Sequence, residues 1–258
     1  MRLVVLGSGT SNGVPVIGCD CAVCRSPDPR DKRTRPSVLV EVGGSRVLID
    51  TTPELRLQLV REGVPSVDAI VFTHEHADHI DGLDDVRVFS MRQRRAMPVF
   101  GPARTLDAIR RSFAYIFAEG ASSGGGRPQL DLRAVDGPFE PVAGIPFEPI
   151  RVWHGAMPIN AYRIGDLAYV TDVNRIDPDA MGRLGNLDVL ILDALRERPH
   201  PTHYSVAEAL AVVAELKPAR TYLTHICHDM AHADMEGKLP PGVELAYDGL
   251  AVELADPA

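Results

Sequence analysis

The chain has 258 residues, of which 45% are hydrophobic and 24% are charged. This composition is typical of a globular protein and excludes a disordered, collagen-like or disulfide-scaffold chain. Lys and Arg number 27 against 35 Asp and Glu, so the net charge of −8 argues against a broad basic face that wraps nucleic acid. No apolar run reaches the roughly 18 residues of a membrane span, and the apolar stretch near the N-terminus is too short for a secretory signal. We therefore expect a cytoplasmic protein outside the membrane.

Short strands and a few helices are predicted in chain order. Apolar runs indicate strands at residues 3–6, 38–42, 46–49, 69–72, 147–153, 161–164, 167–170, 189–192 and 220–223. Helices are predicted from Thr52 as cap and Pro53 to about Glu62, over 81–94, over 103–117, and from a capping box at 205–208 to the residue before Pro218. An Asp248-Gly249 turn is expected to close a terminal hairpin.

These elements predict an α/β (α+β) fold in one domain that spans residues 1–258. The stretch 121–129, ASSGGGRPQ, indicates a flexible loop inside that domain, because three glycines follow two serines. Several apolar strands end in an acidic residue or a histidine. Strand carboxyl ends gather the sites of open α/β sheets, so we expect these side chains to share one edge. They are Asp50, His74, His154, Asp172, Asp193 and His225.

The densest chemical signal is the segment THEHADH, residues 73–79, which directly follows a strand. His74 and His76 alternate along the chain and can point the same way to bind one ion. Asp78 and His79 stand at the turn into a helix and can bind a second ion. Imidazole and carboxylate groups suit zinc, iron or manganese at sites that keep open positions.

A second signal is the cluster GCDCAVC, which holds three of the four cysteines. Cys19, Cys21 and Cys24 offer three thiolates, one fewer than the four ligands of a structural zinc. In a reducing compartment this spacing favours metal binding over disulfides. His228 is the favoured fourth ligand, and Cys227 is the alternative.

The segment HEHADH resembles the HxHxDH signature of the metallo-β-lactamase fold superfamily, and the likeness extends along nearly the whole chain. The resemblance implies a four-layer αββα sandwich that holds two divalent ions, zinc or manganese. It assigns His74, His76 and His154 to one ion, and Asp78, His79 and His225 to the other. Asp172 would bridge the two ions. Asp50 would support the first histidine cluster by contact with its ligands and not with the metal.

The cysteine cluster narrows the resemblance to the PhnP family of cyclic phosphodiesterases, in which a CxCxxC motif and a histidine hold a structural zinc. His228, in THICHD, matches that histidine. In the PhnP family and in the tRNA 3′-processing endonucleases, a histidine before a helix protonates the leaving oxygen. His203 matches by its distance from Ser205, and His200 competes with it.

Other residues near the expected centre are candidates for contacts with substrate or with the metal ligands. The loop 7–13 has backbone amides that suit phosphate, although its glycines are more typical of a tight turn. Arg87 follows Asp84-Asp85 near the motif and is the first candidate for a substrate phosphate. Asp193 is a candidate for substrate contact or for support of a ligand.

Together these features predict a metal-dependent phosphodiesterase with His203 and Asp78 as catalytic residues. A hydroxide that bridges the metals would attack phosphorus, and His203 would protonate the departing alkoxide. The resemblance implies 5-phosphoribosyl 1,2-cyclic phosphate as substrate, opened to ribose 1,5-bisphosphate, and a homodimeric protein. The alternatives are a tRNase Z-like endonuclease, a thioesterase or lactonase, and a PqqB-like protein. We expect a small phosphorylated substrate and no nucleic-acid partner.

Overall fold

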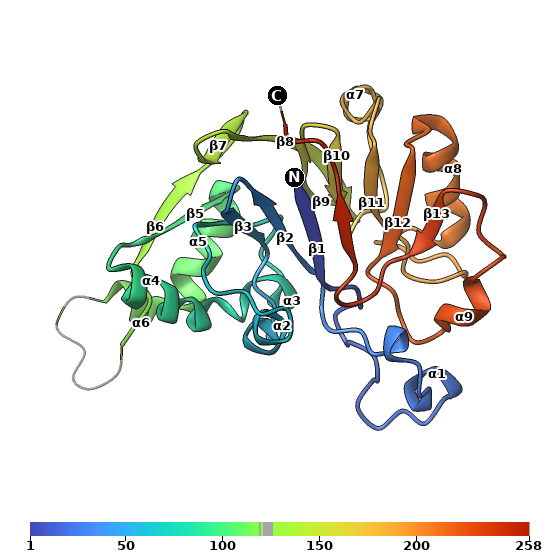
Figure 1. Cartoon of the computed structure of the whole chain (residues 1–258), viewed down its shortest axis with the longest axis horizontal. Helices are drawn as coiled ribbons and strands as arrows, with labels where there is room; N and C mark the ends of the chain where they lie inside the picture. The colour runs from blue at the N-terminus through green and yellow to red at the C-terminus, as the bar shows by residue number, and fades with distance from the viewer. Residues whose placement is uncertain (119, 121–125, 258) are drawn as a thin grey trace.

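The computed structural model describes residues 1–118, 120 and 126–257, which form a pair of mixed seven-stranded sheets packed face to face (Figure 1). Across the first sheet the strands are β14 (Ala251–Glu253), β1 (Arg2–Gly7), β2 (Ser37–Val42), β3 (Ser45–Ile49), β4 (Ala69–Val71), β5 (Met97–Gly101) and β6 (Leu130–Ala134). Across the second sheet they are β13 (Val243–Leu245), β12 (Arg220–Thr224), β11 (Val189–Asp193), β10 (Leu167–Val170), β9 (Met157–Ile164), β8 (Ile145–His154) and β7 (Phe139–Val142).

Helices cover the outer face of each sheet, which gives the four layers of the expected αββα sandwich (Figure 1). Those beside the first sheet are α2 (Leu55–Arg61), α3 (Ala77–Ile80), the 3₁₀ helix η2 (Leu83–Val86), α4 (Arg87–Gln93), α5 (Ala103–Ser112) and α6 (Ala114–Phe117). Those beside the second sheet are α7 (Pro178–Arg183), α8 (Val206–Leu216) and α9 (His232–Met235). Near the lower edge in Figure 1 lie α1 (Ala22–Arg25) and the 3₁₀ helix η1 (Pro29–Asp31).

The alternation of side chains along each strand explains the layers. In β10, Leu167 and Tyr169 enter the core between the two sheets, whereas Ala168 and Val170 face α7 and α8. Successive side chains of a strand point to opposite faces, so a strand covered on both sides is apolar at every position. Because β10 to β13 pair in parallel, and β3 to β6 likewise, their carboxyl ends share edges.

The predicted strands and the capping box at Ser205 are confirmed, but three predicted helix boundaries are wrong. The first helix begins at Leu55, since the Thr52 carbonyl accepts the Leu55 amide in a turn instead of capping a helix. The helix expected over 81–94 is broken near Gly82, whose amide donates to the Thr51 carbonyl and where a Cβ would lie 1.9 Å from the Thr52 oxygen. The helix expected over 103–117 is interrupted at Phe113.

The predicted terminal hairpin is also wrong. The strands that flank Asp248 belong to different sheets, because β13 pairs with β12 and β14 pairs with β1. Asp248 instead accepts hydrogen bonds from Ser8 and Thr34 and so joins three loops. Much of the loop predicted over 121–129 lies outside the described residues. No helix within the described residues is both long and apolar enough to cross a membrane.

Candidate metal centre

The polar residues that end the predicted strands lie at the meeting edges of the two sheets. They are Asp50 after β3, His74 after β4, His154 in β8, Asp172 after β10, Asp193 in β11 and His225 after β12. Asp50, Asp172 and His225 have φ angles of 63°, 54° and 60°. Residues other than glycine rarely adopt this left-handed backbone conformation, and strained backbone of this kind is common at functional sites. The chain therefore turns sharply at three of the strand ends where a polar side chain enters the centre.

The segment between β4 and α3 delivers the other predicted ligands. The His76 carbonyl accepts the His79 backbone amide at 2.9 Å, which starts the short helix α3. Asp78 and His79 are buried in this turn. Glu75 instead accepts a hydrogen bond from Thr105 at 3.3 Å and belongs to none of the clusters of potential metal ligands.

The ligand side chains converge in overlapping groups, within each of which the ligand atoms lie within 4.8 Å of one another. The groups are Asp78, His79, Asp172 and His225; His74, His76 and Asp172; His154, Asp172 and His203; and Asp193, His203 and His225. Asp172 belongs to three of these four groups, so its carboxylate lies at their junction. The rings of His76 and His154 are 5.0 Å apart, which places His154 beside the second group. The structure thus brings together all seven residues to which the resemblance assigned metals.

Hydrogen bonds with neighbouring residues fix the orientation of three of the histidine rings. The pairs are His79 Nδ1 with Asp50 Oδ2 at 2.8 Å, His74 Nδ1 with Thr73 Oγ1 at 3.0 Å, and His154 Nδ1 with the Thr202 carbonyl at 2.8 Å. Asp50 is itself held, because it also accepts the Thr73 amide at 2.8 Å. Partners of this kind select the ring tautomer and leave Nε2 free to bind a metal.

The donor set fits divalent metals. Among the described residues, the Nε2 atoms of His74, His79 and His225 are buried without a hydrogen-bond partner. Although burial opposes it, the charges of His225 and His79 hold the pKa of Asp172 well below its ordinary value. Unpartnered imidazole nitrogens around an ionised carboxylate are costly without a cation, and they are the ligands of zinc and manganese sites. The chain therefore contains a buried His/Asp cluster suited to metal binding.

His203 lies at the rim of this cluster. Its Nδ1 is 2.8 Å from Asp193 Oδ2, and that oxygen also accepts the Val173 amide at 2.8 Å. The His203 ring stacks on His225 with 4.5 Å between centroids. His200, its competitor, is 5.1 Å from His203 by ring centroids and accepts from Thr202 instead of pairing with a carboxylate.

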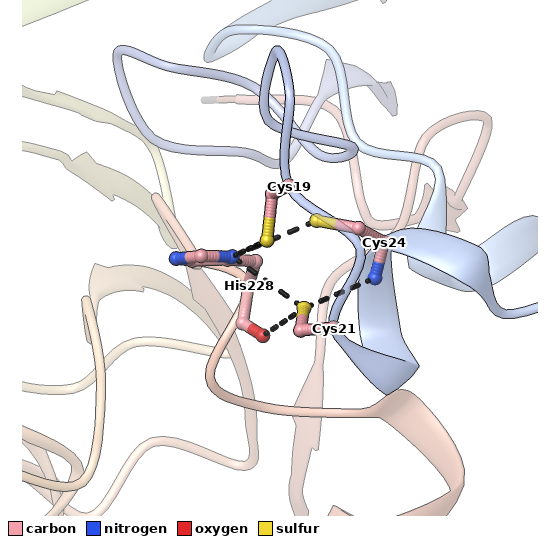
Figure 2. A group of neighbouring side chains, drawn as sticks. All are labelled: Cys19, Cys21, Cys24 and His228. Carbon is pink, nitrogen blue, oxygen red and sulfur yellow. Dashed lines mark hydrogen bonds between the residues drawn. The ribbon is translucent and has the colours of Figure 1, made fainter.

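A second group, which we call the Cys3His cluster, consists of Cys19, Cys21, Cys24 and His228 (Figure 2). The three sulfur atoms lie 3.2, 3.6 and 3.6 Å from His228 Nδ1. The Cys24 amide, which donates to the Cys21 sulfur, lowers the pKa of Cys21 to about 6, whereas burial raises that of Cys24 to about 11. Three thiol sulfurs and one imidazole are the ligand set of a structural zinc. Cys227, the alternative fourth ligand, is not a member of the group and accepts the Asp229 amide.

Two arginines have defined partners. Arg87 pairs with Asp84 at 2.8 Å and is half exposed, and its contact with a substrate phosphate stays a prediction. Arg33, which no sequence pattern singled out, is buried and donates to Asp31 at 3.0 Å and to the carbonyls of Cys227 at 3.0 Å and Met230 at 2.8 Å. It ties the segment after the cysteines to the loop that carries His228. Its surroundings in the sequence, a run of charged residues, gave no signal for burial.

Known proteins share this fold to different extents. A model of the β-lactamase superfamily domain matches residues 45–226. The chain therefore belongs to the metallo-β-lactamase superfamily. Its structure is similar to the crystal structure of a diphosphatase from the PhnP family, with 46% identity, a TM-score of 0.92 and 98% of each chain covered. The chain is thus similar in structure to a PhnP-family diphosphatase and contains a buried His/Asp cluster suited to metal binding.

Two other proteins are similar in more limited ways. Zinc-bound PqqB from Methylobacterium extorquens has a TM-score of 0.76 at 20% identity, with 98% of this chain and 100% of that chain covered, which shows the fold alone. An octanoyltransferase from Porphyromonas gingivalis is 40% identical over 255 residues, 97% of this chain but 51% of that protein. The chain therefore spans about half the length of this relative.

Proposed function

We propose that the chain is a metal-dependent phosphodiesterase that hydrolyses a small cyclic phosphodiester. The observation that carries the proposal is His203, a histidine paired with a buried carboxylate at the rim of the His/Asp cluster. The first candidate substrate is 5-phosphoribosyl 1,2-cyclic phosphate, and ribose 1,5-bisphosphate is the product.

The residues in place would hold two divalent ions, zinc or manganese. Asp78, His79 and His225 offer ligands for one ion, and His74, His76 and His154 for the other. Asp172 lies where both sets meet. The bound ions would supply an activated water and positive charge for the phosphoryl oxygens. The protein provides fixed ligand orientations, a buried site and a proton donor.

The His203–Asp193 pair suits proton donation to a leaving oxygen. The Asp193 carboxylate accepts from Nδ1, so in the imidazolium form the second proton resides on Nε2. The Val173 amide keeps the carboxylate in place and the ring correctly turned. A carboxylate in this position stabilises the protonated ring and sets its orientation. Asp193 therefore acts on the reaction through His203.

The similarity to a diphosphatase favours a second candidate, in which the bond cleaved joins two phosphoryl groups. The leaving group of that reaction is a phosphate, which is a weak base. The leaving group of a cyclic diester is an alkoxide, which is a strong base and depends on a proton donor. A histidine held for proton donation therefore favours the diester as the first choice.

Phosphorus NMR with the manganese-loaded protein tests the proposal. The substrates are 5-phosphoribosyl 1,2-cyclic phosphate, a nucleoside 2′,3′-cyclic phosphate, an aryl phosphodiester and a nucleoside diphosphate. We expect fast opening of the ribosyl ring. Turnover of the diphosphate alone would support the second candidate. No turnover of any of these compounds, with two metals verified per centre, would favour a thioesterase, lactonase or PqqB-like activity.

A leaving-group comparison tests the role of His203. We expect His203→Asn to lower kcat for the ribosyl diester by about 10²- to 10⁴-fold, the usual contribution of a general acid. The same change should affect the aryl diester much less, because its leaving group needs little protonation. His200→Asn is the matched control and should leave kcat for both diesters nearly unchanged, because His200 has no carboxylate partner for proton donation. An equal loss for both diesters would contradict proton donation by His203.

A further inference from the structure

A cavity of about 270 Å³ opens beside His203. Its lining runs from His203 and His200 to His228, so it lies between the His/Asp cluster and the Cys3His cluster. Because His203 faces the leaving oxygen in the proposed reaction, this cavity adjoins the leaving-group side of the substrate. The proposed reaction itself makes no use of it.

Arg196 supplies an unpaired positive charge to this cavity. Its Nε donates to the Arg198 carbonyl at 3.2 Å and one terminal nitrogen donates to the Pro199 carbonyl at 3.0 Å. No carboxylate among the described residues pairs with it. Bonds to its own loop fix the guanidinium, and the remaining N–H groups stay available. A fixed guanidinium with free donors is the group that recognises phosphate best.

The other charges around the cavity leave Arg196 uncompensated. Arg198, the second arginine in the lining, pairs with Asp229 at 2.7 Å, and Asp229 is the one carboxylate in that lining. A zinc ion with three thiolates would add one negative charge near His228, so an anion should bind toward Arg196. The cavity therefore favours an anion although the whole chain has a net charge of −8.

His200 adds a neutral donor on the same side. Its Nδ1 accepts from the Thr202 amide at 3.4 Å and the Thr202 hydroxyl at 3.2 Å. Since an amide can only donate, the ring proton resides on Nε2. Burial lowers the pKa of His200, which favours this neutral form. A neutral imidazole N–H complements a guanidinium in holding phosphate oxygens.

We propose that this cavity binds a second phosphate-type anion of the substrate, on the leaving-group side of the bond that breaks, with Arg196 as its main contact and His200 beside it. The assignment of the cavity to the leaving-group side rests on the proposed function, because it depends on His203 as the proton donor. The substrate class is then a compound with one phosphoryl group to be hydrolysed and another that is only bound. Arg196 is thus a further candidate for phosphate contact besides Arg87.

Binding and kinetics with Arg196→Gln test the proposal. In calorimetric titrations of the metal-loaded protein with ribose 5-phosphate, we expect the variant to weaken binding by about 10- to 100-fold, the value of a hydrogen bond to a charged group. The kcat/KM for 5-phosphoribosyl 1,2-cyclic phosphate should fall to a similar degree, mainly through KM. For ribose 1,2-cyclic phosphate, which lacks the second phosphate, kcat/KM should stay unchanged.

Two controls separate charge from loop structure. The double variant Arg198→Gln, Asp229→Asn removes a neighbouring ion pair with no net charge, and it should leave ribose 5-phosphate binding nearly unchanged. Arg196→Lys keeps the charge and should restore some of the binding. Equal effects of Arg196→Gln on both cyclic substrates, or equal effects of Arg196→Gln and the double variant on binding, would refute the subsite.

The binding experiment also separates this proposal from the proposed function. Weakened ribose 5-phosphate binding in Arg196→Gln, in a protein that hydrolyses no phosphodiester, would support the subsite and refute the proposed function. If the protein hydrolyses the cyclic substrate but binds ribose 5-phosphate equally well with and without Arg196, the proposed function is supported and the subsite is refuted.

Discussion

The His/Asp cluster and the Cys3His cluster are built in different ways. The first takes four ligands from strand ends of both sheets and three from the turn between β4 and α3, and hydrogen bonds to Asp50, Thr73 and Thr202 orient three of its rings. The second takes three residues from a loop and the short helix α1, and its fourth, His228, from the loop after β12 (Figure 2). Its sulfur atoms have the His228 ring as a shared neighbour.

This difference predicts different dependence on metal. Strand ends are fixed by two sheets and a shared core, so the His/Asp ligands are already in place without an ion. Loops have no such support, so metal binding itself contributes to holding the Cys3His segments together. The first cluster is therefore suited to chemistry, and the second to the placement of the loops around the neighbouring cavity.

The largest effect should come from Asp172→Ala, which removes the carboxylate common to three of the four ligand groups. His79 Nε2 and His225 Nε2 lie 3.2 and 3.4 Å from its oxygens. The variant leaves these two imidazole groups without the carboxylate that lies beside both. We expect the centre to lose its metals while the Cys3His cluster keeps zinc. Loss of several kcal/mol of charge stabilisation corresponds to a fall in kcat/KM of about a thousandfold or more.

Metal content by mass spectrometry and phosphodiesterase activity are the readouts for Asp172→Ala. Asp166→Ala, at an exposed turn, is the matched control and should change neither. Full activity with unchanged metal content in the Asp172 variant would overturn the assignment of the centre. Loss of zinc from both clusters would overturn the claim that they are independent.

A smaller effect, on the Cys3His cluster instead of the His/Asp cluster, should come from Arg33→Ala. The variant leaves Asp31 buried without its cation and removes the bonds to the carbonyls on either side of His228. Breaking a buried ion pair costs about 3–5 kcal/mol, which lowers Tm by roughly 10 °C in a chain of this size. We expect weaker zinc binding at the Cys3His cluster and intact metal binding at the centre.

Urea unfolding and zinc competition with a chelator measure this effect. Arg25→Ala is the matched control, because Arg25 lies in the same region but forms an exposed pair with Asp20. Exposed pairs contribute about 1 kcal/mol or less. Equal destabilisation by the two variants would show that Arg33 does not hold the cysteine segment.

The ligands of the His/Asp cluster could be predicted from the sequence, because metal-binding residue types occur directly after apolar strands. His74 and His225 each follow an apolar strand, and the edge to which such strands lead is fixed by sheet topology. The capping box at Ser205 could be predicted for a similar reason, since both of its partners are local. The Cys3His group needed the resemblance as well, because His228 is remote from the cysteines in the sequence.

Features that depend on contacts between distant loops could not be predicted. The break at Gly82 arises from the approach of the Thr52 carbonyl, and the position of Asp248 from bonds to Ser8 and Thr34. Arg33 and Arg196 carry charges that are indistinguishable in sequence from those of a solvated surface. Their burial or lack of a partner follows only from the arrangement of the loops around them.

The smallest predicted effect, from Asp50→Asn, tests whether the support behind the ligands sets metal affinity. Asp50 accepts the Thr73 amide through Oδ1 and His79 Nδ1 through Oδ2, each at 2.8 Å. If the asparagine oxygen keeps the Thr73 bond, its NH₂ group faces Nδ1, so His79 must carry its proton on Nε2, where the metal binds. We expect affinity at the centre to fall by about 10- to 100-fold with the fold intact. Chelator titration should show this loss, while zinc binding at the Cys3His cluster stays unaffected. The surface control Asp131→Asn should change neither affinity. Unchanged affinity in the Asp50 variant would show that the positions of the ligands alone set metal affinity.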